Sequence, residues 1–157
     1  MANVAVKGTF RDLCSYLPQG DEVEQAIQCA FNTLTPADRI KDNLGLYSFP
    51  AISTTKQEID DDPGARPILI VARAYAASTL GYIHLHNADA DSVTEGVNVD
   101  LLLPVSNTAG EISWMVIGGA SFRRFWVTGL TISSSTLTET SVAISVPPDV
   151  WVLYTGN

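Results

Sequence analysis

Two histidines two positions apart have the spacing that comes closest to a metal site. His84 and His86 fall on one face of a predicted strand, with Ile83 and Leu85 on the other, because successive strand side chains alternate. A metal would need a third and a fourth ligand, and the sequence places none beside the pair. We therefore predict no metal and interpret both histidines as ordinary surface or interface residues.

A second candidate is the stretch Asn87–Asp91, whose alternating oxygen-bearing side chains resemble the start of a calcium loop. Ser92 occupies the position of the turn glycine, and the twelfth position is Asn98 rather than glutamate. A solvated hairpin loop is the simpler interpretation.

Asp60–Asp62, followed by Pro63-Gly64, likewise indicates an exposed turn, because catalytic carboxylates are usually buried enough to tune their pKa.

The sequence contains no nucleophile elbow, no phosphate-binding glycine loop and no Cys–His nucleophile signature. Cys14 and Cys29 are expected to be free thiols, because two cysteines at this spacing form neither a disulfide framework nor a metal knuckle. We predict that the chain is not an enzyme and has no cofactor.

The charge balance disfavours two classes of partner. Nine Lys and Arg against seventeen Asp and Glu give a net charge of −8. Nucleic acid and anionic membranes both require cationic side chains, so we predict neither as a partner. The longest apolar runs, Ile68–Ala72 and Leu101–Val105, are too short to span a bilayer. With no signal-peptide pattern, we expect a soluble protein made in the cytoplasm.

Composition changes near residue 66. Residues 1–66 carry 6 basic and 10 acidic side chains, whereas residues 67–157 carry 3 and 7. We predict an N-terminal arm and helical extension over 1–66 and a β-sandwich domain over 67–157. In the arm, Val4, Val6 and Phe10 fit a short strand that pairs with the chain's own sheet or with a neighbouring subunit.

A helix is predicted after residue 20, with Asp21 as its N-cap and Glu24 completing a capping box. An apolar stripe at helical spacing follows: Val23, Ala26, Ile27, Ala30, Phe31 and Leu34. A second short helix begins after Thr35 and is expected to stop near Gly45. The stripe should dock on the β domain of the same chain, with another chain as the alternative. Residues 50–67 are predicted to be a linker or long loop.

The second half is a series of short strands separated by turn residues. The predicted strands are Pro67–Ala76, Gly81–Asn87, Val97–Val105, Glu111–Ile117, Arg124–Ser133, Ser141–Val146 and Val150–Tyr154. Short strands with no helix between them favour a mainly β fold, an antiparallel β-sandwich or jelly roll.

An aromatic and basic cluster, Phe122–Trp126, is the most prominent patch. Core packing, a protein interface and stacking on sugar rings are all open, because arginine and tryptophan are enriched at interface hot spots. The residues predicted to form an interface are Val4, Val6, Phe10, Trp114, Arg123, Arg124 and Trp126.

The order of elements over residues 75–157 is similar to a known module. The elements that carry the likeness are Tyr82–Asn87, Val99–Val105, Phe125–Ser133 and a final strand rich in Val and Tyr. They resemble a β-sandwich module of tailed-phage virion proteins, most like a capsid decoration (cement) protein.

This resemblance implies a virion protein made in the host cytoplasm, which forms a homo-oligomer, a trimer, on a capsid lattice. Its partners would be further copies of itself and the major capsid protein or another virion protein, and no catalytic residues carry over. Arg123 and Trp126 depart from the small polar residues usual around the matching motif. The alternative is a carbohydrate-binding or host-recognition module of a tail or head fibre, with an aromatic platform at Trp114, Trp126 or Trp151.

Overall fold

The computed structural model describes residues 4–60, 66–74, 80–117 and 130–155 of the 157-residue chain. The described part forms two antiparallel sheets and three α-helices. The first sheet, sheet A, has the order β1 (Val4–Gly8), β2 (Leu44–Phe49), β9 (Asp149–Thr155), β4 (Arg66–Arg73) and β7 (Ile112–Val116). Sheet B has the order β3 (Gln57–Asp60), β8 (Leu130–Ser135), β5 (Gly81–His86) and β6 (Leu101–Val105). The helices are α1 (Phe10–Cys14), α2 (Asp21–Thr33) and α3 (Pro36–Ile40).

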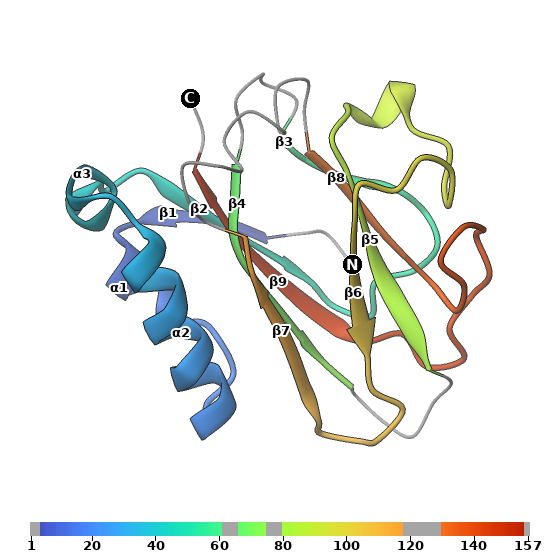
Figure 1. Cartoon of the computed structure of the whole chain (residues 1–157), viewed down its shortest axis with the longest axis horizontal. Coiled ribbons are helices and arrows are strands. Elements are labelled where there is room, and N and C mark those ends of the chain that lie inside the picture. Colours follow the sequence, from blue (N-terminus) through green and yellow to red (C-terminus); the bar gives the residue numbers. More distant parts are fainter. Residues whose placement is uncertain (1–3, 61–65, 75–79, 118–129, 156–157) are drawn as a thin grey trace.

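The elements are arranged in layers, with sheet A in the middle (Figure 1). Helices α1, α2 and α3 lie on one side of sheet A and sheet B lies on the other. The chain is therefore mainly β and is organised as a β-sandwich, as predicted. None of the helices in the described ranges is long and apolar enough to cross a membrane.

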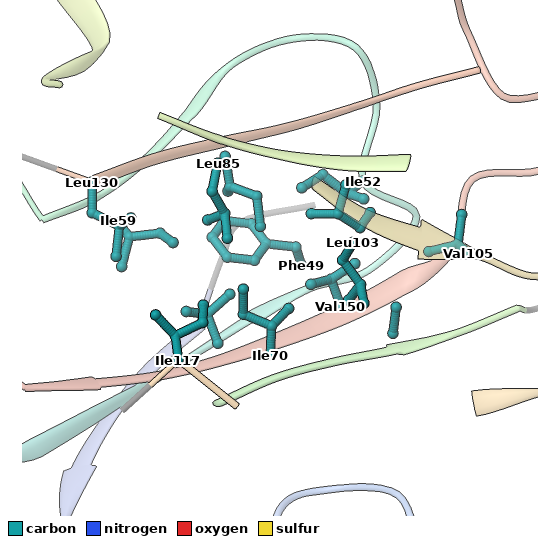
Figure 2. Packing of buried hydrophobic residues seen from close by; sticks show 14 of the residues in the cluster. Phe49, Ile52, Ile59, Ile70, Leu85, Leu103, Val105, Ile117, Leu130 and Val150 are labelled. Carbon is teal, nitrogen blue, oxygen red and sulfur yellow. The ribbon is translucent and has the colours of Figure 1, made fainter. Parts of the chain in front are cut away.

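The larger core fills the space between the sheets. Alternate residues of each strand point inward, as the period of a strand requires. In Figure 2, Phe49 lies between Leu85 from sheet B and Ile70 from sheet A. All three side chains are at most 2% exposed. Burial of one such side chain stabilises the fold by about 1.5–3 kcal/mol.

The opposite face of sheet A is covered by the helices. Leu46, Val71 and Leu153 point away from sheet B and belong to one buried cluster with Val23 and Ala26 of α2. Because both of its faces are buried, sheet A is rich in consecutive apolar residues, a pattern that simple alternation would not produce.

The apolar stripe of α2 faces the core as predicted, but the predicted start of the helix is wrong. Val23, Ala26 and Ala30 are buried. The N-cap is Gly20, without a side-chain cap hydrogen bond, and Asp21 is already in the first turn. The carboxylate of Asp21 therefore sits near the positive end of the helix dipole instead of capping it.

The predicted second helix is confirmed in its start and wrong in its end. The hydroxyl of Thr35 accepts a hydrogen bond from the backbone N–H of Asp38 at 3.2 Å. The helix ends at Ile40, and Gly45 lies within β2. A Cβ at Gly45 would meet the Tyr154 ring, with its hydroxyl oxygen 2.7 Å away. Glycine is therefore needed there for packing and not for ending a helix.

Several predicted strand ends shift. The strand predicted from Val97 begins at Leu101, because residues 97–100 belong to a loop. Ser141–Val146 contains no strand. The described part of the strand predicted over Arg124–Ser133 is β8, and residues 124–129 lie outside the described ranges. Residues 50–67, predicted as a linker, contain β3.

Residues 1–66 contribute to both sheets. Strands β1 and β2 extend sheet A beside β9, and β3 pairs with β8 in sheet B. The change in composition near residue 66 thus falls between strands of one sandwich.

Candidate functional site

The outer face of sheet B, which points away from sheet A, is polar and nevertheless buried. His84, His86, Thr131, Ser133 and Ser135 are each at most 2% exposed. Two loops cover them, residues 87–100 after β5 and residues 136–142 after β8, and together we call these loops the loop layer. The predicted surface position of the two histidines is therefore wrong, because the alternation of β5 shows which face they share but not what covers it.

Ser135 fastens the second loop. Its hydroxyl donates a hydrogen bond to the carbonyl of Thr140 at 2.6 Å. The same oxygen accepts hydrogen bonds from the backbone N–H groups of Leu137 at 3.1 Å and Val142 at 3.0 Å. One buried side chain thus satisfies three backbone groups of a loop, which would otherwise cost free energy when buried.

Equivalent contacts fasten the first loop. The Thr131 hydroxyl donates to the carbonyl of Ala88 at 2.8 Å. Asp89 accepts from the backbone N–H of Ser92 at 3.0 Å and so caps a 3₁₀ turn over residues 90–92. The stretch Asn87–Asp91 thus includes a carboxylate that holds a turn, and the described residues contain no cluster of three or more potential metal ligands.

The histidines are linked to both loops. Nε2 of His84 lies 2.8 Å from the carbonyl of Leu137 and donates to it, because a carbonyl can only accept. His86 makes a hydrogen bond to the backbone of Asn98. Nδ1 of His84 and Nε2 of His86 are buried, and no hydrogen-bond partner for them is found among the described residues. Burial lowers the pKa of both rings, because a charged imidazolium would lose its solvation.

A polar pocket of about 300 Å³ opens beside His86. Its lining consists of His86, Asn87, Ala88, Ser92, Val93, Thr94, Val97, Asn98 and Asp100. Asp100 accepts from the backbone N–H of Asn87 at 2.6 Å, and its charge, with that of Glu95, partly opposes the lowering of the His86 pKa. Hydroxyl, amide and carboxylate groups around a pocket of this size suit a small ligand rich in hydrogen-bonding groups.

A second hollow, the α1–α2 groove, lies between the two helices and measures about 280 Å³. It is lined by Phe10, Arg11, Cys14, Ile27, Gln28 and Phe31. The guanidinium carbons of Arg11 and Arg39 lie 5.6 and 4.6 Å from the centroid of the Phe31 ring. Both distances are within the range of cation–π attraction. Burial raises the pKa of Cys14 to about 12, so its thiol stays neutral.

The predicted interface residues of the arm belong to the fold of their own chain. Val4 and Val6 lie in β1, in register with Ser48 and Leu46 of β2. Phe10 starts α1 and is 1% exposed, so in this fold it packs in the core and is not accessible to a partner.

Two of the three tryptophans lie in sheet A, and Trp126 is outside the described ranges. Trp114 and Trp151 lie on either side of Val71 and face the helices, half-buried. The guanidinium of Arg73 sits 5.3 Å from the Trp151 ring. The remaining predicted site residues outside the described ranges are Asp61, Asp62, Phe122, Arg123, Arg124 and Trp126.

Sequence reasoning missed Ser135 and the pairing of Arg11 and Arg39 around Phe31. The run Ser133–Ser135 inside an otherwise apolar strand was a usable signal, since buried hydroxyls must have partners. The two arginines come together only through the packing of three helices.

No protein-family model matches this chain, and no curated protein or solved structure matches it either.

Proposed function

We propose that this chain is a structural protein of a tailed-phage virion, a capsid decoration protein that assembles into a homo-oligomer, with the trimer as the expected form, and binds the major capsid protein. The observation that carries the proposal is the loop layer. Its backbone is fastened inward by Ser135, Thr131 and His84, while it presents aliphatic side chains outward. The two-sheet antiparallel sandwich is compatible with a jelly roll, which we propose as its finer class.

The exposed side chains are those expected of an interface. Val97, Leu137 and Val142 are 49%, 50% and 44% exposed, and the loops that carry them meet where Gly96 packs against Thr140. Loops that are ordered before binding lose less conformational entropy in the complex. An apolar centre with a charged rim is the usual composition of a protein–protein contact.

Light scattering on the full chain tests the assembly step. We expect a mass that is a multiple of the 16.9 kDa chain, with three copies as the expected number. Replacing Leu137 and Val142 by Asp should shift the protein to the monomer. The matched control, Leu80→Asp, changes a side chain that is 64% exposed outside the loop layer and should leave the mass unchanged.

Binding to particles is tested separately. Phage particles from cells that encode the chain are banded on a density gradient, and the bands are probed for the chain. Co-migration with particles supports the proposal. A monomer at every concentration, together with no chain in any particle band, would overturn it.

The pocket beside His86 favours a second candidate, a carbohydrate-binding or host-recognition module. Its amide, hydroxyl and carboxylate groups are those that hydrogen-bond sugars. A glycan array followed by titration of any hit would test it. Loss of binding in Asp100→Asn, with binding kept in Asp91→Asn outside the pocket lining, would support this function. An array without hits would count against it.

A further inference from the structure

We infer that neighbouring copies pack head to tail, with the loop layer of one copy seated on the α1–α2 groove of the next. The inference rests on the proposed self-assembly and specifies which two surfaces meet. It follows from the charge, the shape and the placement of these surfaces.

The loop layer is acidic with an apolar centre. Residues 87–100 and 136–142 contain Asp89, Asp91, Glu95, Asp100 and Glu139 and no Lys or Arg. Lys56 from a neighbouring loop offsets part of this charge, and its ammonium donates to the carbonyl of Val93 at 2.7 Å. The pKa of Glu95 is lowered first by hydrogen bonds from the backbone N–H groups of Glu95 and Lys56, and to a smaller extent by the charge of Lys56. Asp91, Asp100 and Glu139 remain exposed around the aliphatic side chains.

The α1–α2 groove has the opposite character. Phe31 and Ile27 give it an apolar floor, and Arg11 and Arg39 flank the Phe31 ring. Within the described ranges, neither arginine forms an ion pair. The acidic residues of α2 cluster in its first turn, whereas Phe31 lies near its other end.

The groove has room for an aliphatic side chain. Cavities of about 150 Å³ in protein cores hold a benzene molecule, and this groove measures about 280 Å³. Leu137 is half-exposed on a loop whose backbone is fastened on both sides of it, so it can enter a neighbouring groove without reordering the loop. Glu139, two residues along, would then lie close to the arginines.

The two surfaces lie on opposite sides of the sandwich, with the helices beyond sheet A and the loop layer beyond sheet B (Figure 1). A contact between two different surfaces is heterologous, and repetition of it closes into a ring or continues as a filament. Because the two surfaces lie on opposite sides, copies stacked without rotation form an open chain, and closure into the proposed trimer requires each contact to turn the next copy by about 120°.

Two variants test the contact. The groove variant Arg11→Glu/Arg39→Glu keeps its loop layer, and the loop variant Leu137→Asp/Val142→Asp keeps its groove and repels the acidic groove of the other variant. Each alone should be monomeric, with at least a tenfold higher concentration needed for assembly (about 1.4 kcal/mol). Mixed in equal amounts, they should form a species of two chains and nothing larger, because only one intact contact is possible between them.

A covalent test uses an exposed position in the groove lining. In the Cys29→Ser background, Gln28→Cys places one thiol in the groove, and Leu137→Cys places a second thiol on the loop layer, opposite the groove of the next copy. Glutathione disulfide should join neighbouring chains into covalent multimers and be reduced to glutathione in the exchange. The matched control Leu80→Cys should give none. This measurement does not depend on the groove and loop variants, and circular dichroism of each variant checks that it is folded.

The outcomes distinguish the inference from the function on which it rests. If the groove and loop variants keep the wild-type mass and no covalent multimers form, the head-to-tail contact is overturned. Self-assembly would then occur through another surface. A groove variant that still assembles alone would show that copies meet through matching surfaces. A wild-type chain that is monomeric throughout would overturn both proposals.

Discussion

His84 and His86 lie two residues apart on β5 with their ring centroids 6.4 Å apart, and both are buried beneath the loop layer. His84 contacts the carbonyl of Leu137 in one loop, and His86 contacts the backbone of Asn98 in the other. The pair therefore connects both loops to one strand. Because these are the only histidines in the chain, their titration is separable from that of other side chains.

We expect the protein to lose stability as the pH falls below about 6.5. Burial lowers the pKa of both histidines from 6.5, so the unfolded chain binds protons more readily than the native state. The stability that the two buried, neutral histidines contribute is complete above their unfolded pKa. It decreases as the pH falls from the unfolded pKa to the lower folded pKa. Thermal unfolding between about pH 7.5 and pH 5 should show a falling Tm. In His84→Asn/His86→Asn the dependence should be flatter, and a wild-type Tm that does not change would contradict the prediction.

Ser135→Ala should loosen the second loop. The substitution removes three hydrogen bonds and leaves part-buried backbone groups of residues 137, 140 and 142 without that partner. We expect a loss of about 1–3 kcal/mol in the free energy of unfolding, measured by urea denaturation. Ser106→Ala is the control, because Ser106 bonds Glu111 in an exposed turn. Equal losses in the two variants would show that Ser135 has no special role.

Gly96→Ala should separate the two loops. Gly96 has a φ of +79°, and a Cβ there would meet the backbone of Thr140 and lie 2.7 Å from the backbone nitrogen of Ser141. Gly110→Ala is the matched control, because its φ is +80° and a Cβ there would have no atom of the described residues within 4 Å. Both variants should lose about 1 kcal/mol from backbone strain. Gly96→Ala should lose about 1–3 kcal/mol more from the clash, and equal Tm values would refute this.

The two cysteines should react at different rates with N-ethylmaleimide. Burial raises the pKa of Cys14 to about 12, and the nearby charge of Arg11 offsets this only in part. Cys29 is exposed on α2. Because the thiolate is the reactive form, the Cys29→Ser variant should be modified at least about tenfold more slowly than Cys14→Ser, followed by mass spectrometry. In denaturant the rates should converge. Equal rates in the folded variants would contradict the burial of Cys14.

The sequence predicts those features that depend on neighbours along the chain. The stripe Val23–Leu34, the Thr35 cap and strands such as β5 and β9 follow from local periodicity, and the structure contains them. The N-cap was assigned one residue late, because glycine at position 20 offers no side chain to signal a cap.

The features that the sequence does not predict are non-local. His84 and His86 are buried because the loop after β5 and the loop after β8 cover them, and the sequence of β5 does not indicate this cover. The cation pair around Phe31 likewise joins α1, α2 and the end of α3. Val97 begins the predicted strand Val97–Val105, whereas in the structure it is exposed in a loop.

The position of β9 has a consequence for synthesis of the protein. It pairs with β2 on one side and β4 on the other, so the middle of sheet A is supplied by residues 149–155. During translation, the pair β1–β2 and the pair β4–β7 emerge from the ribosome without the strand that joins them. A chain terminated before Asp149 would expose two unpaired strand edges, which are prone to aggregation. Completion of sheet A is thus coupled to synthesis of the chain through residue 155.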